Sequence, residues 1–88
     1  MTEEITIKQL RERVGIMNRL ADAFDAEAAW HQQQIDKDEE QPVPTPGRFQ
    51  VLRHHVNSRD ELRRNAKTNR MDAQISRTLL EHMEGKAA

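Results

Sequence analysis

The feature of this sequence that most limits its fold is a long run of apolar residues spaced alternately by three and four positions. This spacing is the a and d pattern of a heptad repeat, in which one stripe of a helix packs against another helix. His31 occupies one position of the run, where we expect a polar side chain to fix the register of packing. The run predicts one amphipathic helix over about residues 7–38. Its members are Ile7, Leu10, Val14, Met17, Ala21, Phe24, Ala28, His31 and Ile35.

The start of this helix carries a capping signal. The hydroxyl of Thr6 can accept a hydrogen bond from the amide of Gln9, and the Gln9 side chain can reach back to Thr6. The helix should therefore begin at Ile7. Gly15 lies inside the run, where glycine costs about 1 kcal/mol relative to alanine, so it marks either a close helix contact or a break.

A second apolar set lies on a different face of the same predicted helix, at Ile16, Leu20, Ala23 and Trp30. Two apolar faces imply two neighbours, of which one fits a helix of the same chain and the other a second subunit. Trp30, the only tryptophan, either anchors that second interface or packs within the fold.

Three prolines at alternate positions in residues 42–46, followed by Gly47, stop any helix that reaches them. We expect an extended linker over about residues 39–47 that reverses the direction of the chain.

Apolar residues after the linker predict a helical region over about residues 48–84. Ser58 and Glu61 have the form of a capping box, so a third, short helix could end at residues 57–58. One continuous helix is the alternative we favour, because packing often overrides an internal cap. Gly85 is expected to end the helix.

The predicted fold is all-α: an antiparallel hairpin of two long helices, forming a single domain over residues 1–88. With 35% hydrophobic residues and few aromatics the core is thin, and without cysteine no disulfide can reinforce it. Oligomerisation is the remaining way to gain buried area, so we expect a dimeric bundle. The seam predicted for self-association consists of Leu10, Val14, Met17, Phe24, Leu62 and Leu80.

The net charge of −1 hides an asymmetry between the two halves of the chain. Residues 1–44 have a balance of −5 and residues 45–88 a balance of +4, so the two halves are matched to lie against one another. A basic stripe on the second helix is expected to be a solvated face with ion pairs, or alternatively a surface for an acidic protein or for phosphate. It comprises Arg59, Arg63, Lys67, Arg70 and Arg77.

Catalysis, metal binding and membrane insertion are not indicated. The four histidines lack the i, i+4 spacing of a helical metal site, and no catalytic motif or phosphate-binding loop is present, so we expect no enzyme, metal or cofactor. No window approaches the ~20 apolar residues of a membrane span, and the start is acidic, so we expect a cytoplasmic protein.

These features predict a non-catalytic protein–protein interaction module that self-associates and binds another protein as an inhibitor or adaptor. Ile16, Trp30 and the basic stripe are the candidate partner-binding residues. A second hypothesis is a DNA-binding regulator, because residues 6–26 resemble a helix-turn-helix segment with Gly15 at the turn, although Asp22 and Asp25 would repel phosphate. The third is a structural subunit of a larger assembly.

Overall fold

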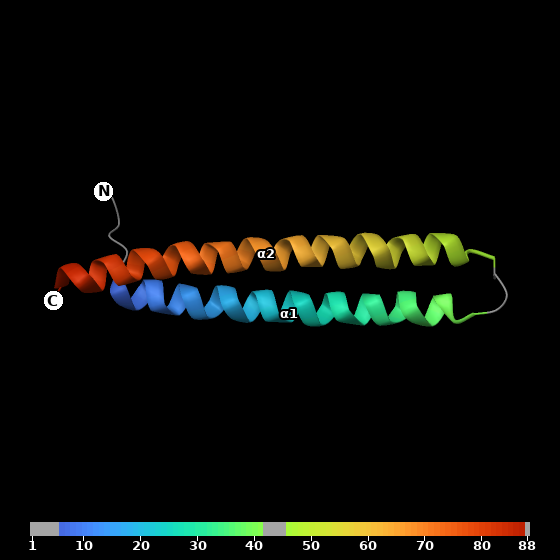
Figure 1. The fold of residues 1–88 in the computed structure, drawn as a ribbon, viewed down its shortest axis with the longest axis horizontal. Helices are drawn as coiled ribbons and strands as arrows, with labels where there is room; N and C mark the ends of the chain where they lie inside the picture. The colour runs from blue at the N-terminus through green and yellow to red at the C-terminus, as the bar shows by residue number, and fades with distance from the viewer. Residues whose placement is uncertain (1–5, 42–45, 88) are drawn as a thin grey trace.

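The chain folds into two long helices that lie side by side and antiparallel (Figure 1), in a computed structural model that describes residues 6–41 and 46–87. Helix α1 spans Ile7–Glu39 and α2 spans Arg48–Ala87. The molecule measures 65 × 26 × 13 Å, so it is two helices wide and one helix thick. The predicted all-α hairpin is confirmed. Neither helix in the described part of the chain is long and apolar enough to cross a membrane.

The capping signal at the start of α1 is present in the structure. The amide of Gln9 donates to the Thr6 hydroxyl at 3.1 Å, and the Thr6 amide donates to Oε1 of Gln9 at 2.9 Å. Two of the four orphan amides of the first turn are therefore satisfied, and α1 begins at Ile7 as predicted.

The loop end of the hairpin is closed by Arg48, the first residue of α2. Its Nε donates to Oδ2 of Asp38 at 2.8 Å, and its Nη2 donates to the Asp38 carbonyl at 2.7 Å. Gly47, the residue before α2, has a φ of 80°, a conformation that glycine adopts without strain. Residues 42–45 of the predicted proline linker lie outside the described residues.

Helix α2 is continuous through residues 57–58, as favoured, so the third short helix does not form. The expectation that Gly85 ends this helix is wrong, because α2 continues to Ala87. In the described chain only Gly47 has a positive φ, so Gly85 stays helical and does not form the left-handed cap.

Both expectations for Gly15 are also wrong. It lies within an unbroken α1, and a Cβ built there would meet only Arg19 of the same helix, at 3.8 Å, with no part of α2 close by. Since residues 6–26 have no turn at Gly15, they do not form a helix-turn-helix, and the structural premise of the DNA-binding hypothesis is lost.

The core runs as a narrow seam between the two helices. Most of its buried apolar residues are alanines, which let the helices pack but bury little apolar area. The remaining predicted seam residues Val14, Met17, Phe24, Leu62 and Leu80 are half-buried. The heptad pattern is therefore used within one chain. The buried apolar residues are Leu10, Ala21, Ala28, Ile35, Ala66 and Ala73.

Candidate interaction surface

Contacts between the helices divide the hairpin into two flanks, one on each side of the seam. If the buried Ala21 of α1 and Ala66 of α2 are taken as heptad a positions, Arg13 and Asp72 both occupy g positions, and they form an ion pair on one flank. On the other flank Arg70 of α2 pairs with Asp25 of α1, both at e positions. Pairing of g with g and of e with e is the geometry of antiparallel helices, so c and g residues of both helices share one flank, whereas b and e residues share the other.

We call the c and g side the apolar flank, because large apolar side chains from both helices are exposed there. They are between 41% and 68% exposed, although residues of these types are usually inside a fold. Ile16 and Trp30, predicted as partner-binding residues, are both among them. The set consists of Ile16, Leu20 and Trp30 from α1 and Val51, Ile75 and Leu79 from α2.

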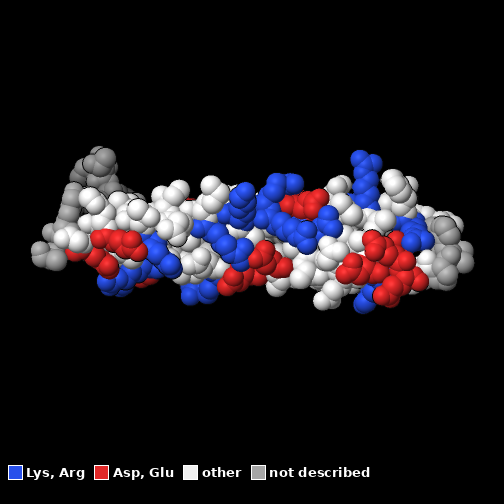
Figure 2. All heavy atoms as spheres, in the orientation of Figure 1, with Lys and Arg blue, Asp and Glu red and all other residues white. Residues whose placement is uncertain are grey.

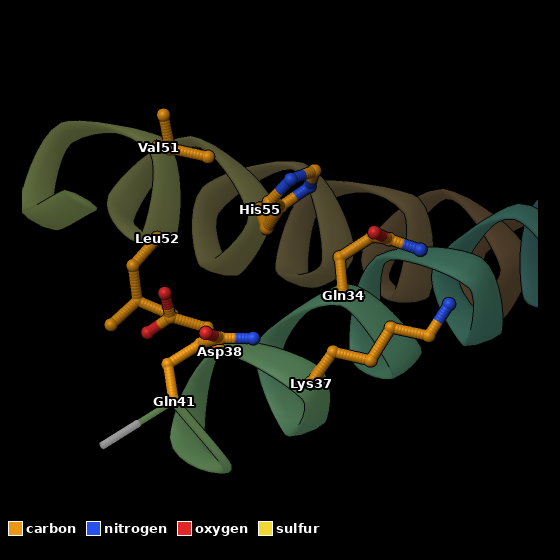
Figure 3. Close-up of a pocket in the computed structure, with 7 residues that line it drawn as sticks. All are labelled: Gln34, Lys37, Asp38, Gln41, Val51, Leu52 and His55. Carbon is orange, nitrogen blue, oxygen red and sulfur yellow. The ribbon is translucent and has the colours of Figure 1, made fainter. Parts of the chain in front are cut away.

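Three shallow hollows follow the apolar flank from the loop end to the open end of the hairpin. The first, of about 200 Å³, is lined by both helices, by Val51 and His55 of α2 and by Gln34 and Lys37 of α1 (Figure 3). The second, of about 260 Å³, lies beside His31 and Leu62. The third, of about 510 Å³, lies on α2 alone; its surface is mostly apolar, and its lining residues are Gln74, Ile75, Thr78, Leu79 and His82. A partner helix packs its side chains into depressions of this kind.

A cluster of aromatic rings lies between the first two hollows. Nδ1 of His31 is 2.8 Å from Nδ1 of His55, and His54 is the next ring along α2. Trp30 contacts His31 and His55 edge-on, with ring centroids 4.9 and 5.6 Å apart. Removal from water lowers the pKa of His55, and the nearby His31 and His54 lower it further.

Sequence reasoning missed this cluster, because it sought histidine pairs within one helix. The missed signal lies in the hairpin register: Asp38 and Arg48 meet at the loop, and one heptad further along each helix brings His31 to His55. Within residues 6–41 and 46–87 the structure has no group of three His, Asp or Glu side chains able to hold a metal ion.

The opposite side, which we call the charged flank, contains most of the basic stripe. Arg70 reaches Asp22 at 3.2 Å and also Asp25, so the acidic first helix neutralises it as expected for a solvated face. Figure 2 shows Lys and Arg gathered over the middle of α2, with Asp and Glu below them over α1 and near the loop end. Arg63, Lys67 and Arg77 are exposed.

Arg59 is separated from the rest of the stripe. It occupies an a position in the seam, where its Nη1 donates to Oε1 of Gln32 at 2.8 Å and its Nη2 lies 2.9 Å from Asp60. Its guanidinium therefore bonds to residues of the hairpin itself. The other four residues of the basic stripe face outward.

The Arg13 and Asp72 ion pair is the main charged feature of the apolar flank. Two hydrogen bonds from Arg13 hold the pKa of Asp72 below its usual range, and the Asp72 carboxylate raises the pKa of Arg13. Each charge of this pair is thus balanced by its neighbour, which leaves the flank apolar in character. Comparisons with protein-family models, with curated proteins and with solved structures find no match to this chain.

Proposed function

We propose that this chain is a non-catalytic protein–protein interaction module that self-associates through its apolar flank. The observation that supports this proposal is the alignment of exposed Ile, Leu, Val and Trp side chains from two different helices on one side of the molecule. Large apolar side chains that are exposed together on one side of a molecule are typical of a site of association. The extended shape and this surface together indicate a partner or an oligomer.

A second copy is the occupant that the composition of the core favours. The seam is mostly alanine, so one hairpin buries little apolar area of its own, and small folds without disulfides gain stability by oligomerisation. A two-fold axis would place the same flank of two copies face to face and cover both at once. The product is an antiparallel four-helix bundle.

The distribution of charge also favours the apolar flank as the interface. Because Arg13 and Asp72 are already paired, a second copy that covers this flank leaves neither of these charges without a partner. The b and e positions carry more than twice as many charged residues and are suited to remain in water. Between residues 9 and 82, the charged residues at c and g positions are Arg13, Glu27, Lys37, Glu61 and Asp72.

Sedimentation equilibrium of three glutamate variants tests this proposal. Leu20→Glu and Ile75→Glu place a charge on the apolar flank, whereas Phe49→Glu changes an exposed apolar residue at an e position on the other flank. We expect the wild type and Phe49→Glu to be dimeric and the two flank variants to be monomeric with unchanged helix content. The matched control separates loss of the interface from a general effect of adding charge.

Two results would contradict self-association through this flank. One is a wild-type chain that is monomeric at roughly 100 µM, a concentration at which a dimer of micromolar affinity is formed. The apolar flank would then be a binding surface for another protein. The other is a dimer that survives Leu20→Glu and Ile75→Glu. An assembly larger than a dimer would favour the third hypothesis, a structural subunit.

A further inference from the structure

The histidine pair near the loop end joins the two helices through a single hydrogen bond. His31 on α1 is 9% exposed, and its Nδ1 lies 2.8 Å from Nδ1 of His55 on α2. The two rings are tilted by 49°, with centroids 5.1 Å apart. The contact is therefore a direct link between the helices inside the seam, one heptad from the loop-closing pair of Asp38 and Arg48.

The number of protons on the pair decides whether this hydrogen bond exists. A bond between two Nδ1 atoms needs one proton between them, so one ring donates and the other accepts. Two neutral rings satisfy this condition, as does one imidazolium with one neutral ring. When both rings are protonated, each Nδ1 carries a hydrogen, neither can accept, and two positive charges stand 2.8 Å apart.

We propose that the hydrogen bond between His31 and His55 is a pH-sensitive latch, which holds the loop end of the hairpin closed and opens when both rings are protonated. This inference does not depend on self-association, since the bond lies within one chain. It concerns the part of the apolar flank that carries Trp30, whose ring packs edge-on against both histidines.

Charged groups from both helices surround the pair and do not replace the bond. Glu27 and Glu61 line the hollow beside His31. Their carboxylates favour a single positive charge on the histidine pair, but they cannot restore the hydrogen bond once both rings are protonated. Lys37 lines the hollow beside His55 and adds a positive charge, while Asp38 in the same hollow is already paired with Arg48. His54 on α2 is a further titratable neighbour of His31, and Arg59 on α2 bonds Gln32, the residue that follows His31.

The sign of the pH effect follows from His55. Its pKa in the folded chain is lowered, so near and below the ordinary pKa of about 6.5 the unfolded chain binds more protons than the folded chain. The stabilising contribution is complete above that value and is lost as the pH falls below it. Aspartate and glutamate ordinarily titrate at lower pH, so a measurement from about pH 7.5 to 5 follows the loss of the His55 contribution with little contribution from carboxylates.

Trp30 provides the measurement, because it is the only tryptophan and touches both rings. We would follow its fluorescence and the thermal unfolding of the hairpin from about pH 7.5 to 5. The wild type should show a change in Trp30 emission and a fall in Tm over the same range. Work on the Ile75→Glu background removes self-association from the measurement.

Two variants at the pair and one remote control complete the experiment. His31→Leu restores an apolar residue to the heptad seam and should fold, and His55→Leu removes the other partner. In each of these variants, the decrease in Tm from about pH 7.5 to 5 should be at most half of the wild-type decrease. His82→Gln, which changes a histidine at the open end, should keep the full decrease. The latch is refuted if His31→Leu and His55→Leu keep the wild-type pH dependence, or if Trp30 emission is constant across the range.

Discussion

Arg13 of α1 and Asp72 of α2 are joined by two parallel hydrogen bonds, from Nε to Oδ1 at 3.1 Å and from Nη2 to Oδ2 at 2.7 Å. Ser76, one turn further along α2, also donates to Oδ1 of Asp72 at 3.2 Å. Two-point pairing fixes the orientation of both side chains as well as their separation. The pair therefore fixes the register of α2 against α1. It does so next to Ala73, a buried residue of the seam.

Asp72→Asn should lower the stability of the hairpin at neutral pH and have little effect in acid. The pKa of Asp72 is lowered in the folded chain, so its contribution is present above the ordinary value of 3.8 and is lost as the pH falls below it. Thermal unfolding at about pH 7 and pH 2.5 measures the difference. Asp36→Asn, which removes a carboxylate bonded only within α1 by Gln32, is the control and should show a smaller difference at neutral pH.

Leu10→Ala should reduce the free energy of unfolding by about 2–4 kcal/mol, because it leaves a cavity in the seam. Leu10 is the largest fully buried side chain of the described residues, at 2% exposed. Leu20→Ala removes the same atoms from a side chain on the apolar flank that is 41% exposed. In urea denaturation of a dilute, monomeric sample, equal losses for the two variants would contradict the placement of the core.

Alanine at the two structurally different glycines should act in opposite directions. Gly47→Ala forces a side chain into a φ of 80° and should cost about 1 kcal/mol. Gly15→Ala places a methyl group in an unbroken helix with its nearest contact at 3.8 Å, and should stabilise by up to about 1 kcal/mol. Chemical denaturation gives both values, and a loss of stability in Gly15→Ala would mean that α1 is not a regular helix at that point.

Arg70→Glu should destabilise the hairpin more than Arg77→Glu. The first change places a carboxylate beside Asp22 and Asp25 of α1, whereas the second changes an exposed residue of the charged flank. The difference in Tm should shrink in about 1 M salt, where charges are screened beyond about 3 Å. Equal effects of the two substitutions at low salt would show that the Arg70 ion pairs contribute nothing to the closed hairpin.

The helices and their antiparallel arrangement could be predicted, because these depend on local signals. The Thr6 capping box and the spacing from Ile7 to Ile35 determine α1, and the prolines of the sequence exclude one continuous helix from α1 into α2. The weaker pattern of α2 still sufficed, since its packing against α1 overrides the internal cap at Ser58. The prediction that Gly85 ends α2 was wrong, because glycine often ends helices but is also tolerated within their last turns.

The α1 part of the apolar flank was predicted, but the histidine pair and the α2 residues that share this flank were not, because they depend on the register between the helices. A list of histidines along the chain gives no reason to join His31 to His55, and the register follows only once the loop-closing contact of Asp38 with Arg48 is known. Likewise, Arg59 appeared to belong to an outward stripe until its contact with Gln32 placed it in the seam. Self-association and partner binding stay predictions.

The smallest dimension of the hairpin, 13 Å, has a consequence for how its backbone exchanges hydrogen with water. In a single hairpin no amide lies beneath a second layer of protein, so each is protected by its own helical bond and by one neighbouring helix. Separation of the helices begins at the ends, so exchange should be slowest near Ala21 and Ala66 and faster in both directions. The stability of this hairpin against opening is therefore distributed along its length, and each pair of facing heptads contributes part of it.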